Sequence, residues 1–257
     1  MDDVAGLRVI FNDEKQLQAF RADMHRARIK HERHSRDGQY DYISHPKSNG
    51  YRGVHDIYRY NVNSKHAERA PGLFIEIQYR TLVQHSWATA NEVIGYVTDS
   101  EPKYERGDDR YVRFMALASE ILARAHEQRR GPLPDIPDDQ LLIEMRDLER
   151  DLKLLDRLSF LRVAKINDAN KRHYILVFSR EGKLEVRHYD KNRRALAALF
   201  KLENEQPDSN VVLVGAGSPD EVELSFRNYF SDTVEFADLL RGGIEKLGWN
   251  MGRSFLF

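Results

Sequence analysis

The sequence contains no cysteine. Disulfide frameworks and thiolate metal sites are therefore excluded. It also contains no apolar run near the ~20 residues that a helix needs to span a bilayer. The N-terminus, Met1-Asp2-Asp3, lacks the basic and then apolar pattern of a signal peptide. Together these absences predict a cytoplasmic protein with no membrane partner.

The chain has no excess of charge of either sign: 40 basic side chains stand against 41 acidic ones. Without a global positive field, a general nucleic-acid coat is not expected, and any anion site must be local. The densest basic stretch lies between His25 and Arg36. A solvated helix C-terminus, where cations suit the helix dipole, explains this stretch as well as a phosphate-facing surface does.

The first part of the chain alternates between strand and helix patterns. A buried strand is expected at residues 4–11, followed by a helix capped by Asn12 with Leu17, Phe20 and Met24 on its inner face. The polar segment 36–53 is expected to be a long loop, a type that is often functional. Further strands are expected at residues 54–62 and 73–81, with a helix from Leu82.

The strand at residues 73–81 is the most informative of these elements. Its alternation places Leu73, Ile75, Ile77 and Tyr79 on one face and Glu76, Gln78 and Arg80 on the other. We expect the first face to pack and the second to present chemistry. In the next helix, Trp87 is expected on the core side, with His85 and Glu92 on a face that overlooks the same cleft.

The second part of the chain begins after the break Gly131-Pro132-Leu133-Pro134. An amphipathic helix with an apolar seam from Leu141 to Leu155 follows, and core packing is its expected role. Strands are then expected at 160–166, 173–179, 183–189 and 210–214, with a helix at 192–203. Helices are also expected to start at Ser218 and at Asp232, each with a capping signal. The predicted division is a catalytic core at 1–130, a linker and helix at 131–157, and a small accessory α/β domain at 158–257.

Three features of the first part suit phosphoryl transfer: Asp3 next to a strand, the loop 47–55, and Glu76. Such transfer needs Mg²⁺ held by carboxylates, cations on the phosphates and an aromatic surface for a base. Asp3 and Glu76 could hold the metal, Lys47 could meet phosphate, and Tyr51 could stack on a purine. The ordinary alternatives are a terminal acid at Asp3, a Glu76 paired with Arg80 or Arg8, and a Tyr51 that rests on the sheet.

Four motifs in order resemble those of the RelA/SpoT synthetase family. They are Asp3-Val4-Ala5-Gly6-Leu7-Arg8, the loop from Pro46 to His55 with Lys47 and Gly50-Tyr51, the strand Glu76-Ile77-Gln78-Tyr79-Arg80-Thr81, and the segment from Gln84 to Glu92. The resemblance covers roughly residues 1–96, and its strength comes from the joint order of motifs that are modest singly. It implies an α/β fold, a nucleotidyltransferase-like mixed sheet flanked by helices.

The resemblance also implies an activity: transfer of pyrophosphate from ATP to the 3′ hydroxyl of GDP or GTP, which gives the alarmones ppGpp and pppGpp of the stringent response. Asp3 and Glu76 would be catalytic and bind Mg²⁺, with Glu76 also placed to help deprotonate the attacking hydroxyl. The residues implied to bind substrate are Lys47, Asn49, Tyr51, His55, Gln78 and Arg80. The hydrolase domain of the bifunctional family members is absent, which implies synthesis without hydrolysis.

The sequence departs from the family pattern at two places. Gly53 stands where the acceptor loop of the family has serine. In the family, a helix and a strand with basic ATP-binding residues precede the aspartate motif, whereas here this motif starts at Asp3. We therefore expect the donor-binding part to be missing from these 257 residues, and a chain that truly starts at Met1 to bind ATP poorly.

Other functions remain open at this point. A toxin-type relative would pyrophosphorylate the 3′ end of tRNA, and the basic stretch between Arg26 and Arg36 would suit tRNA. A non-catalytic nucleotide sensor or antitoxin-like module would suit the missing donor part. The C-terminal domain has no matched catalytic motif, and we expect it either to bind a regulatory protein partner or to serve stability alone.

Overall fold

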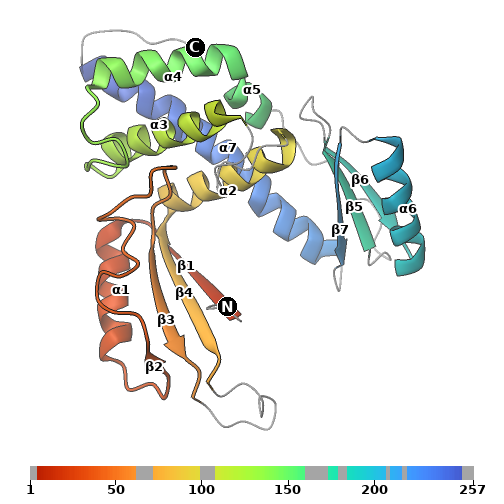
Figure 1. Cartoon of the computed structure of the whole chain (residues 1–257), viewed down its shortest axis with the longest axis horizontal. Coiled ribbons are helices and arrows are strands. Elements are labelled where there is room, and N and C mark those ends of the chain that lie inside the picture. The colour runs from red at the N-terminus through yellow and green to blue at the C-terminus, as the bar shows by residue number, and fades with distance from the viewer. Residues whose placement is uncertain are drawn as a thin grey trace.

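The computed structural model describes residues 5–61, 72–98, 108–159, 173–178, 184–206, 209–215 and 219–250. Its N-terminal sheet has the strand order β1-β4-β3-β2, formed by β1 (Ala5–Phe11), β4 (Phe74–Thr81), β3 (Val54–Arg59) and β2 (Glu32–Arg33). Strand β1 runs parallel to β4, while β3 runs antiparallel to both of its neighbours (Figure 1). The predicted α/β class with a mixed sheet is confirmed.

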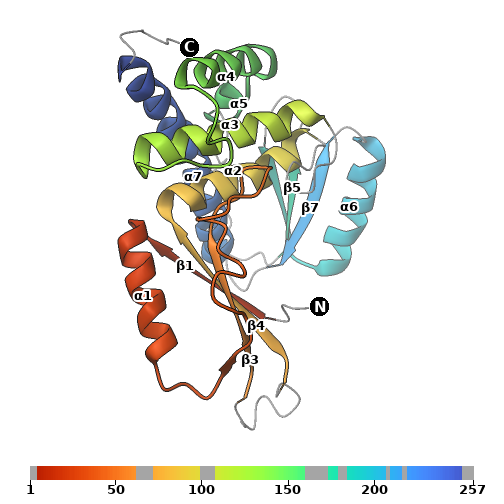
Figure 2. The ribbon, with the colours of Figure 1, turned by 60° about the vertical axis from the view of Figure 1, so that its left-hand side comes forward.

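Helix α1 (Glu14–Arg26) covers one face of this sheet (Figure 2). Its N-cap is Asp13, one residue after the predicted Asn12, and the Asp13 carboxylate accepts a hydrogen bond of 2.7 Å from the backbone N–H of Gln16. Leu17 is fully buried and packs in a cluster with Ile77 and Tyr79 of β4. The alternation predicted for β4 therefore places its apolar residues under α1, and leaves Glu76, Gln78 and Arg80 for the opposite face.

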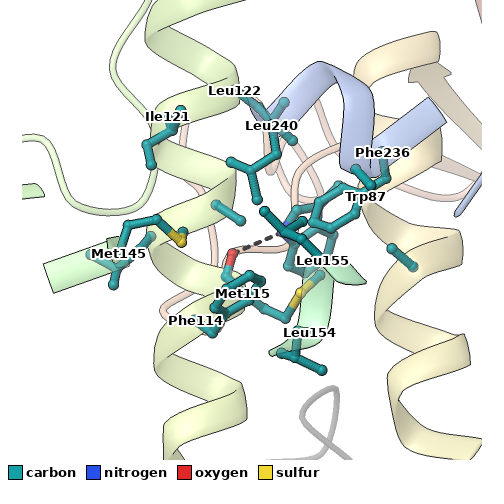
Figure 3. Close-up of a cluster of buried hydrophobic side chains, with 14 of the residues drawn as sticks. Trp87, Phe114, Met115, Ile121, Leu122, Met145, Leu154, Leu155, Phe236 and Leu240 are labelled. Atoms are coloured by element: carbon teal, nitrogen blue, oxygen red, sulfur yellow. Dashed lines mark hydrogen bonds between the residues drawn. The ribbon is translucent and has the colours of Figure 1, made fainter. Parts of the chain in front are cut away.

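Five helices form a second and larger core above the end of this sheet: α2 (Leu82–Thr98), α3 (Asp109–His126), α4 (Asp138–Leu152), α5 (Leu154–Ser159) and α7 (Pro219–Asn250). Trp87 of α2 lies at its centre, and the indole Nε1 donates a hydrogen bond of 2.8 Å to the backbone carbonyl of Met115 in α3 (Figure 3). The seam residues Leu141, Met145 and Leu155 are buried in this cluster. Core packing, as predicted, explains the seam.

The strands β5 (His173–Phe178), β6 (Leu184–Tyr189) and β7 (Asn210–Gly215) form an antiparallel sheet in the order β6-β5-β7. Helix α6 (Asn192–Glu205) packs on it, and Leu202 meets Ile175 and Val177 in a small third core. These four elements match their predicted positions within two residues. The strand predicted at residues 160–166 lies outside the described residues.

The prediction of two helices after residue 217 was wrong, because one helix, α7, spans both. Asp232 lies inside it, and its carboxylate contacts Nε2 of His85 in α2 at 3.1 Å instead of capping a new helix. The apolar positions Phe236, Leu240 and Ile244 continue at helical spacing and are buried. Within the described residues, no helix is both long and apolar enough to cross a membrane.

The packing of helix α7 affects where the boundaries between domains can be drawn. Its buried residues belong to the same cluster as those of α2 and α3, and Gly243 lies close enough to α3 that an added Cβ would be 3.1 Å from Cγ2 of Ile121. The boundaries 1–130, 131–157 and 158–257 therefore stay a proposal. The packing favours a version in which α7 completes the helical core, while β5, β6, α6 and β7 form the accessory unit.

Leu240→Ala tests whether α7 belongs to this core. The leucine is fully buried, so its truncation should lower the free energy of unfolding by about 2–5 kcal/mol. Asp238→Ala on the same helix is the matched control, because its side chain is exposed and its ion pair with Arg241 is 3.8 Å long; an effect within about 0.5 kcal/mol is expected. Urea denaturation of both variants measures the difference. Equal midpoints for the two would contradict the packing of α7.

Candidate active site

A pocket of about 250 Å³ opens on the face of the sheet opposite α1, between the loop after Pro46, strands β3 and β4, and helix α2. Six of its lining residues are the six predicted substrate-binding residues: Lys47, Asn49, Tyr51, His55, Gln78 and Arg80. The other lining residues come from α2 and are Trp87, Ala88, Asn91 and Glu92. Asp3, the predicted partner of Glu76, lies outside the described residues.

The loop that carries Lys47 and Tyr51 is a tight turn against the helical core. The Gly50 N–H donates to the Lys47 carbonyl at 2.9 Å, and the Tyr51 N–H donates to Oδ1 of Asn49 at 3.1 Å. Gly50 has a φ of +101°, and an added Cβ would lie 2.8 Å from both the Met115 carbonyl oxygen and the Trp87 ring. Glycine is required at this position by its backbone conformation and by its close approach to α2 and α3.

Five side chains form a closed ring of hydrogen bonds beside the pocket. Nδ1 of His55 lies 2.6 Å from Oε1 of Glu76, and Nε2 of His55 lies 2.5 Å from the Tyr51 hydroxyl. Nη2 of Arg80 donates to the Tyr51 hydroxyl at 3.2 Å and to Oε1 of Gln78 at 3.1 Å. Nε2 of Gln78 then donates to Oε2 of Glu76 at 2.6 Å and closes the ring. For a neutral imidazole, this arrangement places the proton of His55 on Nδ1.

Glu76 is held as a carboxylate by this ring. The hydrogen bond from His55 is the main cause that lowers the pKa of Glu76 to about 2, and the bond from Gln78 adds to it, while partial burial opposes both. An acid with so low a pKa is a weak general base at neutral pH, but it remains available as an oxygen ligand for a hard cation. The described residues contain no group of three or more His, Asp or Glu that could hold a metal without help from a substrate.

Tyr51 forms part of the pocket wall, and its hydroxyl is held by side chains of β3 and β4. Its ring meets the rings of Tyr42 and Trp87 edge-on, at centroid distances of 5.7 and 6.4 Å. Lys47 Nζ and Arg80 Cζ lie over the ring at 5.4 and 5.2 Å from its centroid. Burial raises the pKa of the Tyr51 hydroxyl, so the phenol stays neutral. The pocket thus combines an aromatic wall with two cations, a combination that suits a phosphorylated heterocycle.

Helix α2 supplies a wall that the sequence analysis only partly anticipated. Glu92 lines the pocket, whereas His85, its predicted companion, does not. Burial, with help from Arg8 and Arg80, lowers the pKa of His85 to about 4. Asn91 is buried and was not predicted; its Oδ1 has no hydrogen-bond partner among the described residues. The spacing of four between Trp87 and Asn91 was the available signal.

The departure from the family pattern at Gly53 has a local consequence. An added Cβ there would lie 3.2 Å from the Tyr51 hydroxyl and 3.4 Å from Cγ of Arg80. The glycine therefore leaves room for the Tyr51 hydroxyl at the point where it joins the hydrogen-bonded ring.

Comparison with known proteins is consistent with the motifs in this pocket. Residues 1–101 match the family model described as the region found in RelA / SpoT proteins. This part of the chain is similar to the RelA/SpoT region. The resemblance inferred from the motifs is thereby confirmed, and the matched range contains the loop, both strands and the part of α2 that line the pocket.

Known relatives of the RelA/SpoT region include the GTP pyrophosphokinase YjbM of Bacillus subtilis (strain 168). It is 30% identical over 129 residues, which are 50% of this chain and 56% of the relative. The chain thus spans little more than half the length of the curated relative that it matches. Among solved structures, small alarmone synthetase 1 of Bacillus subtilis bound to its product pppGpp matches 48% of this chain and 57% of its own, at 27% identity and a TM-score of 0.38. Small alarmone synthetase 2 of the same organism matches 47% and 60%, at 26% identity and a TM-score of 0.39.

The low pKa of Glu76 predicts how stability depends on pH. A group whose pKa is lower in the folded than in the unfolded protein stabilises the fold above its unfolded pKa, and this contribution is lost as the pH falls through the folded pKa. Here the window runs from 4.5 down to about 2. The stability difference between wild type and Glu76→Gln should therefore shrink between pH 5 and pH 2 in urea titrations. Titration of the Glu76 carboxyl carbon by NMR checks the same point, and a midpoint near 4.5 would contradict the hydrogen-bonded ring.

Proposed function

We propose that this protein is a nucleotide pyrophosphokinase that transfers pyrophosphate from ATP to the 3′ hydroxyl of GDP or GTP. The observation that carries the proposal is the convergence of Lys47, Tyr51, His55 and Arg80 on one pocket, with the Glu76 carboxylate directly behind them. The match of residues 1–101 to the RelA/SpoT region and the name of the relative YjbM support the same activity.

In the proposed reaction, the 3′ oxygen of the acceptor forms a bond to the β-phosphorus of ATP. The bond between that phosphorus and the oxygen that bridges it to the α-phosphate breaks, AMP leaves with the electron pair of that bond, and the proton of the hydroxyl is released to solvent. Such a transfer depends on positioning and electrostatic stabilisation more than on covalent help from the protein. Lys47 and Arg80 supply cations at the pocket, and the hydrogen-bonded ring fixes the directions of Glu76, His55 and Tyr51.

The pocket chemistry favours guanine as the acceptor base. Tyr51 lines the pocket, and we propose that its ring stacks on the base; the buried Oδ1 of Asn91 lacks a donor in the part of the chain that the structure describes. The guanine edge carries two neighbouring donors, N1 and N2, whereas the adenine edge carries one, the N6 amino group. A buried acceptor without a partner costs free energy, so a base that supplies the missing donor is preferred.

Magnesium fits the donor chemistry of the site. Glu76 is a persistent carboxylate whose two oxygens each accept one hydrogen bond, and Mg²⁺ is commonly bound by one or two carboxylates together with substrate phosphates. Glu76 would hold it with Asp3. The bound ion would neutralise charge that develops on the transferred phosphates. Because of its low pKa, we assign Glu76 to metal binding ahead of proton abstraction.

The alternatives differ in product. A tRNA-directed transferase would place the label of [γ-³²P]ATP on tRNA, and a sensor would bind GDP without transfer. Incubation of the protein with labelled ATP, Mg²⁺ and either GDP, GTP or tRNA, followed by chromatography, separates the three.

The cysteine-free composition suits a reducing compartment, and the cytoplasm is the proposed location.

Glu76→Gln keeps the shape of the side chain but removes its charge. We expect the rate of pyrophosphate transfer to fall on the order of 10³-fold, as is usual for the loss of one preorganised electrostatic group. GDP affinity should change far less, since we assign Glu76 to the metal and not to the base. Initial rates with labelled ATP and calorimetry with GDP measure the two quantities. Transfer at the wild-type rate would refute the role of Glu76.

Tyr51→Ala and Tyr51→Phe form a matched pair for the base-binding role of Tyr51. The alanine variant should weaken GDP binding by about 1–3 kcal/mol, the range for loss of a stacking aromatic. The phenylalanine variant keeps the ring and loses only the hydroxyl bonded to His55, so its loss should be smaller. Calorimetric titrations with GDP, IDP and ADP measure both effects.

IDP lacks the N2 amino group and ADP lacks the N1 donor, so the wild type should bind GDP best. A thermal melt of each variant is the control for folding. Unchanged GDP affinity in Tyr51→Ala, together with a lowered melting temperature, would mean that the ring serves packing and not base stacking.

A further inference from the structure

A buried ion pair lies behind the pocket and joins its loop to helix α3. The guanidinium of Arg52 donates through Nη1 to Oε2 of Glu127, and its Nε donates to Oγ of Ser119 at 2.9 Å. The side chains of Arg52 and Glu127 are only 1% and 7% exposed. Ser119 and Glu127 lie beyond the 101 residues that match the family model. The loop is therefore fixed by a part of the chain that its motif does not include.

Glu127 connects more than the loop. Its second oxygen, Oε1, accepts from the hydroxyl of Thr81 at 2.7 Å and from Nε2 of Gln84 at 2.9 Å. Thr81 is the last residue of β4, and Gln84 lies in the first turn of α2. One carboxylate at the C-terminal end of α3 thus holds the acceptor loop, the end of β4 and the start of α2 together.

Two of the residues held by Glu127 are adjacent in sequence to a residue that lines the pocket. Arg52 follows Tyr51 in the loop, and Thr81 follows Arg80 in β4. Tyr51 and Arg80 are hydrogen-bonded to each other across the pocket at 3.2 Å. The position of Tyr51 relative to Arg80 therefore depends on the hydrogen bonds that Glu127 accepts from Arg52 and Thr81.

We propose that Arg52 and Glu127 are positioning residues for the nucleotide pocket, and that α3 is a working part of the site. This inference rests on the proposed function for its ligand but not for its geometry. When the ion pair is absent, the loop samples conformations in which Tyr51 is displaced from Arg80. The apparent Kd for the nucleotide then equals the intrinsic Kd divided by the fraction of molecules that remain competent to bind.

Both partners of the ion pair must be replaced together, because a single buried charge without its partner destabilises the fold. Removal of Arg52 alone leaves the Glu127 carboxylate buried without its counterion, and this outcome destabilises the fold strongly. Arg52→Met combined with Glu127→Gln removes both charges. It also leaves a glutamine oxygen that can accept from Thr81 and Gln84 in place of Oε1. Replacement of both partners of a buried pair is often close to neutral for stability, so this double variant is expected to fold.

Arg113→Met combined with Glu144→Gln is the matched control. This pair also joins α3 to another element, α4, through two hydrogen bonds of 2.6 and 2.7 Å, and neither residue lines the pocket. Both double variants remove one positive and one negative charge. The control pair is more exposed than the pair of Arg52 and Glu127, so a difference between the variants reports on the place and the burial of the ion pair and not on net charge.

The first measurement is GDP binding by calorimetry and the steady-state kinetics of transfer. For the Arg52/Glu127 double variant, we expect the Kd and the KM for GDP to rise about tenfold, as for a loop that is competent a tenth of the time. The kcat should fall less than KM rises. The control should change Kd less than twofold. Equal effects in the two variants, or no effect in the first, would overturn the proposal.

The second measurement needs no ligand. Hydrogen exchange of the peptide that spans residues 47–53 should become faster in the Arg52/Glu127 variant, because the amides of Gly50 and Tyr51 are hydrogen-bonded inside this loop. The control should exchange like the wild type. If exchange becomes faster in the double variant but the wild type does not bind GDP, only the proposed function is refuted and the positioning role stands. Unchanged exchange would refute the positioning role.

A milder variant serves if the double variant does not fold. Ser119→Ala removes the acceptor of the Arg52 Nε bond and leaves the ion pair in place. Exchange of the same loop should increase in this variant as well, by less than in the double variant. Protection equal to that of the wild type would count against the role of α3.

Discussion

The register of β3 against β4 is the constraint on which the pocket depends. In this antiparallel pair, His55 lies opposite Gln78, between the neighbouring positions Glu76 and Arg80 on the same face of β4. A single imidazole can therefore reach the Glu76 carboxylate with one nitrogen and the Tyr51 hydroxyl with the other. A slip of one residue would turn His55 towards α1 and expose the apolar residues of β3. Burial on the α1 side thus fixes the geometry on the pocket side.

The alternation of β3 also places a side chain on the face of the sheet that α1 covers, and its role there is structural. Asp56, next to His55, is fully buried under α1, where Arg21 and Nε2 of His25 each approach its carboxylate to 2.8 Å. These two partners lower the pKa of Asp56 against the opposing effect of burial. Arg33 pairs with Asp37 at 2.7 Å. Two arginines of the basic stretch, Arg26 and Arg33, thus form ion pairs with Asp23 and Asp37, and His25 contacts Asp56, which favours the structural explanation for these members of the stretch.

Sequence reasoning succeeded where the cause is local. Strand alternation placed Glu76, Gln78 and Arg80 on one face. It failed where a contact between residues far apart in the sequence determines the structure. The capping signal at Asp232 was overridden by apolar spacing and by His85, which is far away in the chain. The bond between Arg52 and Glu127 joins residues 75 positions apart, and no periodicity reports on such a pair. The α2 wall of the pocket was missed in part because Trp87 serves the core and the pocket at once.

Helix α2 belongs both to the pocket and to the helical core, so it connects the pocket to the C-terminal part of the chain. One side of α2 lines the pocket through Asn91 and Glu92, and its other residues pack against α3 and α7. Helix α7 also leads directly from the strands β5 to β7 into the helical core (Figure 1). Because packed interiors deform little, a shift of α7 would be passed to α2 and thus to one wall of the pocket. A regulatory partner of the C-terminal unit stays a prediction, but its effect would have a physical route. The same route means that removal of the C-terminal part would strip apolar surface from α2 and α3, so a change of activity in a truncated protein would not by itself demonstrate regulation.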